Sequence, residues 1–129
     1  MVALVFLRRT GFHFLMQTIQ ELRCARREAE RSLKIHDDRL PMPKNGDLRV
    51  WWIPQVPGKP FHVLVPDIRT AKVMLDALAQ YDLFQLANKL KPDYSNVGGL
   101  EVHDGFEWSG WEDDEGQEID AYGLDGKLV

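Results

Sequence analysis

The run Leu48-Arg49-Val50-Trp51-Trp52-Ile53 is made largely of β-branched and aromatic residues, which favour a β-strand. The next segment, Pro54 to Pro60, holds three prolines in seven residues, which exclude regular structure there. A second apolar run, Phe61 to Val65, follows it. We therefore expect two strands, 48–53 and 61–65, that pair across a stiff loop.

Side chains alternate between the two faces of a strand, so Trp51 and Trp52 should point to opposite faces. We expect one face to be covered by helices, with Leu48, Val50, Trp52, Phe61, Val63 and Val65 on it. The other face would carry Arg49, Trp51, Ile53, His62 and Leu64. Three of these five side chains are large and apolar, and we expect an open sheet face of this kind to need a cover.

Helical patterns follow the second strand. Asp67 is a good N-cap, and a buried stripe of Ile68, Ala71, Leu75 and Leu78 should follow it. The spacing of Asp82 and Gln85 matches a capping box and predicts a second short helix over 83–90, which Pro92 ends. The segment 92–99 is rich in turn residues and is predicted to be a loop.

The last regular element is predicted to be a hairpin with Asp-Gly in its loop. A two-residue loop would mix polar and apolar side chains on each face. A three-residue loop, 103–105, places Val102 opposite Phe106 and Leu100 opposite Trp108, with the loop glycine in the left-handed conformation. We therefore predict the three-residue loop.

This order of elements predicts an α+β fold in which helices cover one face of a small antiparallel sheet. The compact domain should span 47–111. Residues 1–46 should be an N-terminal extension, with an amphipathic helix over 15–35 and a linker over 37–46. Residues 112–129 should form a solvated, mobile acidic tail.

Charge is distributed unevenly along the chain. Residues 1–46 have a net charge of +4, residues 47–111 of −2 and residues 112–129 of −6. The two ends can therefore attract each other or two different partners. Direct nucleic-acid binding is not expected, because Glu21, Glu28 and Glu30 dilute the arginines of the predicted helix.

Sequence motifs for catalysis or for cofactor binding are missing. The four histidines and Cys24 do not have the spacing of metal ligands, and no phosphate-binding or nucleophile motif occurs. The apolar Met1 to Leu7 is too short for a membrane span and lacks the preceding positive charge of an export signal. We expect a cytoplasmic, non-enzymatic protein without cofactor, metal or small-molecule substrate.

Tryptophan is enriched at binding hot spots, and the acidic run next to Trp111 could imitate nucleic acid against a basic groove. The predicted partner-binding residues are therefore Trp51, Arg49, Trp111, Asp113, Asp114 and Glu115. The partner should be a bacterial or phage protein.

Four stretches resemble a family of short phage and prophage proteins known as superinfection exclusion proteins. They are Leu48 to Pro57, Tyr81-Asp82-Leu83-Phe84-Gln85, Lys91-Pro92-Asp93-Tyr94-Ser95-Asn96 and Gly98-Gly99-Leu100. The resemblance covers about residues 47–122. It implies a product that helps a resident phage exclude a second one, and it brings no catalytic residues. Members of this family begin near the first strand. The preceding 46 residues are therefore either an extension that covers the sheet or the result of an upstream start, with Met16 or Met42 as the natural one.

Three functions remain open at this point. The first is a binding protein in phage–phage or phage–host competition. The second is an inhibitor of a bacterial defence complex, of the anti-CRISPR type, whose acidic end imitates nucleic acid. The third is a small enzyme, for which the sequence offers no motif.

Overall fold

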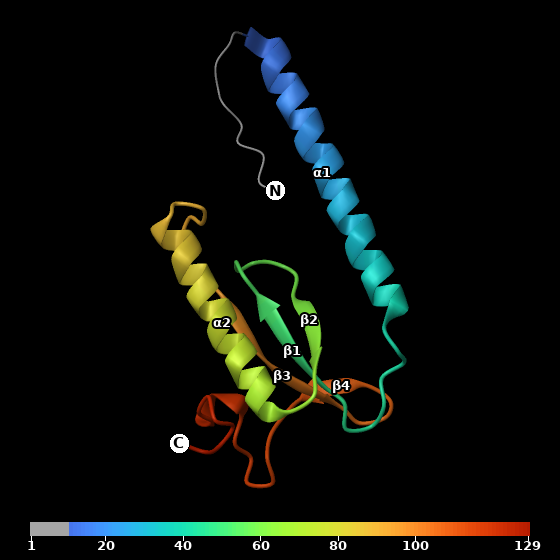
Figure 1. Ribbon diagram of the computed structural model, residues 1–129, viewed down its shortest axis with the longest axis vertical. Helices are drawn as coiled ribbons and strands as arrows, with labels where there is room; N and C mark the ends of the chain where they lie inside the picture. The colour runs from blue at the N-terminus through green and yellow to red at the C-terminus, as the bar shows by residue number, and fades with distance from the viewer. Residues whose placement is uncertain (1–10) are drawn as a thin grey trace. The chain divides into compact units, whose positions relative to one another are not determined.

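A computed structural model describes residues 11–129, with side chains of the first helix described from Gln17 onward. The chain divides into two compact units, Met1–Met42 and Pro43–Val129. In the first unit, α1 spans Gly11–Arg39 (Figure 1). This confirms the predicted N-terminal helix, which is longer than expected and takes up the beginning of the predicted linker.

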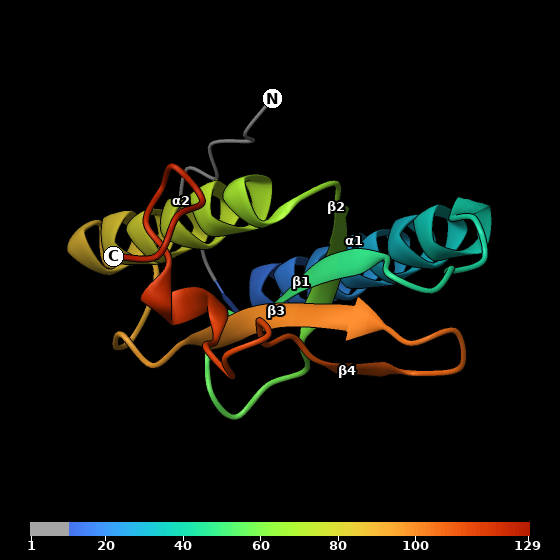
Figure 2. The same ribbon diagram turned by 90° about the horizontal axis from the view of Figure 1, so that it is seen from below.

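The second unit is built on a four-stranded antiparallel sheet. Its strands are β1 (Leu48–Ile53), β2 (Phe61–Val65), β3 (Val97–His103) and β4 (Trp108–Gly110), in the order β2-β1-β3-β4. The bounds of β1 and β2 are those predicted, and the proline-rich segment between them is irregular. Figure 2 shows α2 (Ile68–Ala87) lying over one face of this sheet, which confirms the α+β class.

The core lies between α2 and the covered face of the sheet. Alternation along β1 buries Val50 and Trp52 and leaves Trp51 partly exposed. Asp67 caps α2 as predicted, because its Oδ1 accepts a hydrogen bond from the Thr70 amide at 2.7 Å. The buried hydrophobic residues are Val50, Trp52, Val65, Ala71, Leu75, Leu100 and Ile119.

The predicted break of the helix at Asp82 is wrong, because α2 runs without interruption to Ala87. Asp82 is only 2% exposed, and its carboxylate faces the core instead of capping a helix. Its Oδ2 accepts hydrogen bonds from Trp52 Nε1 at 3.2 Å and Asn96 Nδ2 at 2.8 Å, and it lies 3.3 Å from Lys91 Nζ. A capping box and a buried acceptor use the same residue type, and only the tertiary partners of Asp82 distinguish them.

The glycine pair predicted to lie in a loop belongs to β3. Gly98 pairs with Trp52 and Gly99 with Trp51. A Cβ atom on Gly98 would lie 2.2 Å from Trp52 Cε3, and one on Gly99 would lie 2.9 Å from Trp51 Nε1. The two glycines therefore let the two indole rings cross β3, one on each face of the sheet.

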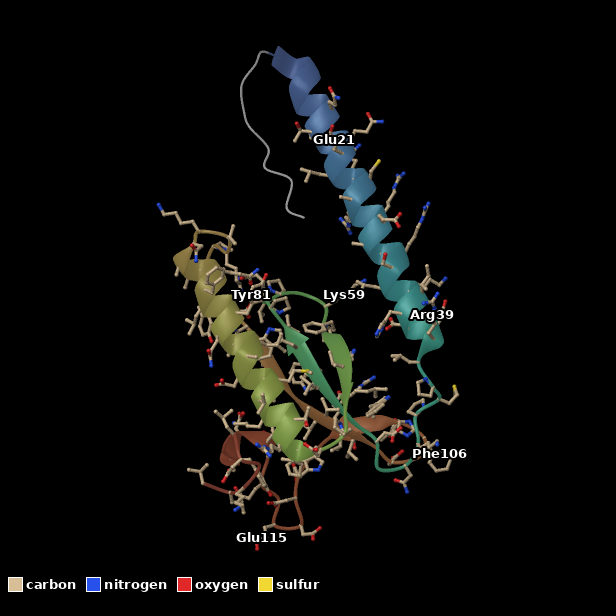
Figure 3. The ribbon with its side chains drawn as sticks, viewed as in Figure 1. Glu21, Arg39, Lys59, Tyr81, Phe106 and Glu115 are labelled. Atoms are coloured by element: carbon tan, nitrogen blue, oxygen red, sulfur yellow. The ribbon has the colours of Figure 1, made fainter. Side chains whose placement is uncertain are left out.

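The predicted hairpin register is also wrong. His103 pairs with Trp108, so the loop contains the four residues 104–107. Asp104 Oδ1 accepts hydrogen bonds from the amides of Glu107 (2.8 Å) and Phe106 (2.7 Å), and these bonds lower the pKa of Asp104. The capped turn outweighs the burial of Phe106, whose side chain is 94% exposed at the tip (Figure 3).

The C-terminal segment is not the solvated tail that its charge predicts. Ile119, within the 3₁₀ turn Ile119–Ala121, is 4% exposed and belongs to the core. The Trp111 and Tyr122 rings pack edge to face with centroids 5.5 Å apart. Ile119, Trp111 and Tyr122 therefore hold the acidic segment against the sheet, since the carboxylates between them can stay in solvent.

We expect the second unit to fold without the first. A protein of residues 42–129 should show one cooperative unfolding transition, because the buried residues named above all lie in Pro43–Val129. Thermal unfolding followed by circular dichroism is the measurement. An aggregated chain, or one without a cooperative transition, would mean that residues 1–41 complete the core.

Candidate functional site

The face of the sheet opposite α2 carries a cluster of charged and aromatic side chains around Arg49. Arg49 Nε donates to Glu101 Oε2 at 2.6 Å, across the β1–β3 pair. Its guanidinium lies 4.2 Å from the centroid of the Trp108 ring, and Glu101 Oε2 lies 4.0 Å from His62 Nε2. Arg49 is thus held from two sides by its own domain, which orients its guanidinium along the sheet.

Trp51 and Trp111 come together although sixty positions separate them in the chain. They line one pocket of 190 Å³ beside β3. Trp51 reaches it from β1, and Trp111 reaches it because its amide donates to the Leu100 carbonyl at 2.9 Å, directly after β4. The remaining lining is Gly98, Gly99, Leu100, Gly110, Glu112, Glu118, Ile119 and Asp120.

The acidic segment around this pocket is ordered by one of its own carboxylates. Asp113 Oδ1 accepts from the amides of Gln117 (2.8 Å) and Glu115 (2.9 Å), and its Oδ2 accepts from the Tyr122 hydroxyl at 2.6 Å. The bond from Tyr122, followed by the amides, holds the pKa of Asp113 below its ordinary value. The same bond raises the pKa of Tyr122 to about 12.

The structure therefore separates the six predicted partner-binding residues into four groups. Trp51 and Trp111 share the pocket, and Arg49 lies in the neighbouring cluster on the sheet. Asp113 organises its loop from within. Asp114 and Glu115 are exposed at the turn, where Figure 3 shows Glu115 at the outer end of the loop.

Replacing Asp113 by Asn should loosen the C-terminal loop and reduce the acid sensitivity of the fold. A carboxylate whose pKa is lowered on folding stabilises the native state above its unfolded pKa and loses this contribution as pH falls through the folded value. The stability difference between wild type and Asp113→Asn should therefore be present at pH 7 and shrink below about pH 4. Denaturant titrations at pH 7 and pH 3 measure it.

Asp114→Asn is the matched comparison, since it removes the same charge from an exposed neighbour. It should leave stability nearly unchanged at both pH values. Equal effects of the two substitutions would show that the net charge of the segment matters and the hydrogen bonds of Asp113 do not.

Sequence reasoning missed the three carboxylates that line the pocket, Glu112, Glu118 and Asp120. It also missed that Gly110 lines the pocket, where the absence of a side chain leaves open space: an added Cβ would meet no atom within 4 Å. The available signal was Ile119, a single β-branched apolar residue inside an acidic run. Such a residue indicates that the segment returns to the core.

The part of the chain that the structure describes holds neither a metal-binding group nor a membrane-spanning helix. Its His, Cys, Asp and Glu side chains form no group of three or more that could hold a metal ion. Neither of the helices described has the length and apolar character needed to cross a membrane.

Comparison with known proteins gives two matches. A family model described as Superinfection exclusion gene product 17 matches residues 47–125, a range that begins one residue before β1 and includes both pocket tryptophans. The Superinfection exclusion protein of Salmonella phage P22 is 56% identical over 57 residues, which are 44% of this chain and 55% of that protein. The chain thus matches about half the length of this curated relative. No solved structure matches.

Proposed function

The chain belongs to the superinfection exclusion gene product 17 family, and we propose from this membership that it helps a resident phage to exclude a second phage by binding a macromolecule. It does so inside the bacterial host cell and without catalysing a reaction. The partner is a protein of the host or of the incoming phage.

One observation carries the binding mechanism, namely the joint pocket of Trp51 and Trp111 beside the Arg49 cluster. Tryptophan and arginine, together with tyrosine, are enriched among the residues that dominate binding energy at protein interfaces. Both rings are partly exposed, so they offer apolar area to a partner without leaving the core unfilled.

The buried ionisable groups support binding over catalysis, because their partners are structural. Asp82 contacts Trp52, Asn96 and Lys91. His103 packs edge to face on Trp108 and its Nδ1 accepts from the Gly105 amide at 3.1 Å. Catalytic acids and bases are typically found with their polar atoms directed into a cleft.

No comparison supports the inhibitor of a defence complex that the acidic run suggested. Asp113 is engaged within its own loop, which leaves the exposed pair Asp114 and Glu115 at the turn. We therefore propose exclusion by binding alone.

Trp51→Ala is expected to abolish most of the exclusion. The measurement is the plating efficiency of a challenging phage on cells that produce the chain. The challenging phage should plate at least about tenfold better on cells with the Trp51→Ala variant, as for the loss of an interface hot spot.

Tyr81→Ala is the comparison variant, because Tyr81 is an aromatic residue 57% exposed on α2 (Figure 3). It should exclude as well as wild type. Undiminished exclusion by Trp51→Ala would contradict a binding site at this pocket.

A further inference from the structure

The pocket lies against an open edge of the sheet. β4 pairs only with Glu101 to His103, and beyond it the Trp111 amide bonds to Leu100. On that side, the part of β3 from Val97 to Gly99 has no strand partner among residues 11–129. An uncovered sheet edge is a template for pairing with another extended chain.

The phase of the hydrogen bonds shows which residue faces this edge. The His103 amide donates to the Asp47 carbonyl, so the odd-numbered residues of β3 bond toward β1. Hydrogen bonding alternates along an antiparallel strand, and Leu100 accordingly bonds toward Trp111. The N–H and C=O groups of Gly98 therefore point to the open side, where Gly98 lines the pocket.

The pocket has the size and charge for one cationic side chain. Its 190 Å³ is below the roughly 300–1,000 Å³ of small-molecule sites. Glu112, Glu118 and Asp120 line it, are exposed, and form no ion pair with any residue from 17 to 129. Carboxylates beside indole rings form a site for a guanidinium group, which stacks on aromatic faces and pairs with carboxylates.

We propose that this pocket binds an extended segment of a partner protein that carries an arginine. The segment pairs with the β3 edge at Gly98, and its arginine enters between Trp51 and Trp111 toward the carboxylates. Backbone pairing supplies affinity and the pocket supplies specificity, as in other cases of strand addition. This inference rests on the proposed function and specifies the chemistry of the partner.

The test uses the full chain and a short acetylated, amidated peptide, Thr-Val-Arg-Val-Thr, with a second peptide in which neutral citrulline replaces the arginine. Binding is followed by NMR at millimolar peptide. The arginine peptide should shift the amide signals of Gly98, Gly99 and Gly110 and the indole signals of both pocket tryptophans. Its affinity should fall as salt is raised, and the citrulline peptide should bind several-fold more weakly.

Two charge variants distinguish binding at the pocket carboxylates from attraction to the net negative charge of the segment. Glu118→Gln combined with Asp120→Asn should weaken the arginine peptide roughly three- to tenfold, as for the loss of two partly exposed ion pairs. Asp114→Asn combined with Glu115→Gln removes the same charge from the turn and should change the affinity less than twofold. Equal losses in both variants would overturn the inference.

A steric variant tests the pocket without altering charge. Gly110→Leu adds a side chain where a Cβ meets no neighbour, at a glycine that does not have a positive φ. It should fold and lose binding of the arginine peptide. Shifts that persist in this variant, shifts confined to other surfaces, or the absence of binding by wild type would each overturn the inference.

Plating efficiency distinguishes this inference from the proposed function. Loss of exclusion by Gly110→Leu, together with loss of peptide binding, supports both. Full exclusion by Gly110→Leu overturns the pocket as the partner site and leaves binding through the remaining sheet face. A wild-type chain that binds the arginine peptide and excludes no phage would contradict the proposed function alone.

Discussion

Replacing Trp52 by alanine should lower the free energy of unfolding by about 3–5 kcal/mol, the range for truncating a buried large aromatic residue. Trp52 is 6% exposed and lies in the core with Val50 and Leu100. The substitution leaves a cavity over Gly98, which has no side chain to fill it. It also removes the hydrogen bond from Trp52 to Asp82. Denaturant titration of the full chain measures the loss.

Trp51→Ala is the matched variant, because the same residue type occupies the adjacent position on the opposite face. Its stability loss should be clearly smaller, since Trp51 is partly exposed, while its loss of exclusion should be the larger of the two. Equal stability losses would show that both rings serve the core and would remove Trp51 from the binding site.

The second large effect is expected at Lys91. Its side chain is 7% exposed, its Nζ lies 3.3 Å from Asp82 Oδ2, and it donates to the Pro54 carbonyl. Lys91→Met keeps the aliphatic length and removes the charge, leaving a buried carboxylate without its cation. Breaking a buried ion pair on one side costs about 3–5 kcal/mol.

The double variant Asp82→Asn with Lys91→Met separates charge from packing. An asparagine at position 82 still offers an oxygen to Trp52 Nε1 and Asn96 Nδ2 but carries no charge. The double variant should therefore be more stable than Lys91→Met alone in the same titration. A double variant at least as unstable as Lys91→Met would mean that the lysine acts through its packing and its bond to Pro54.

The stretches that resemble the family meet at this buried pair. Gln55 Nε2 donates to Asp93 Oδ1 at 2.5 Å, and the Val56 amide donates to the Ser95 carbonyl at 2.7 Å. Together with Asp82 and Lys91, these contacts fasten the loop after β1 to the end of α2 and the chain leading into β3. Part of these motifs thus specifies the fold, while Arg49, Trp51 and the glycine pair of the same motifs belong to the proposed binding surface.

Local patterns were sufficient for much of the architecture. Alternation and β-branched residues predicted β1 and β2 with their bounds, because a period of two and a proline-rich boundary are properties of adjacent residues. The Asp67 cap and the stripe of α2 follow from contacts within one or two helical turns. The prediction that Trp51 and Trp52 face opposite sides needed only the pleat of the strand.

Apart from the hairpin loop, which Asp104 caps within three residues, the missed features depend on residues far away in the chain. The local pattern around Asp82 predicts a helix cap, but the carboxylate is buried against Trp52, Lys91 and Asn96. The local pattern around Gly98 predicts a turn, but the residue lies in β3 where an indole ring crosses the strand. Ile119 is one apolar residue among carboxylates, and it is buried because it packs into the core formed by the sheet and α2. The pocket joins β1, the end of β4 and the C-terminal turn, so no local window of sequence contains it. Tertiary packing sets these features because burial and hydrogen-bond satisfaction are properties of the assembled core, which overrides the preferences of single segments.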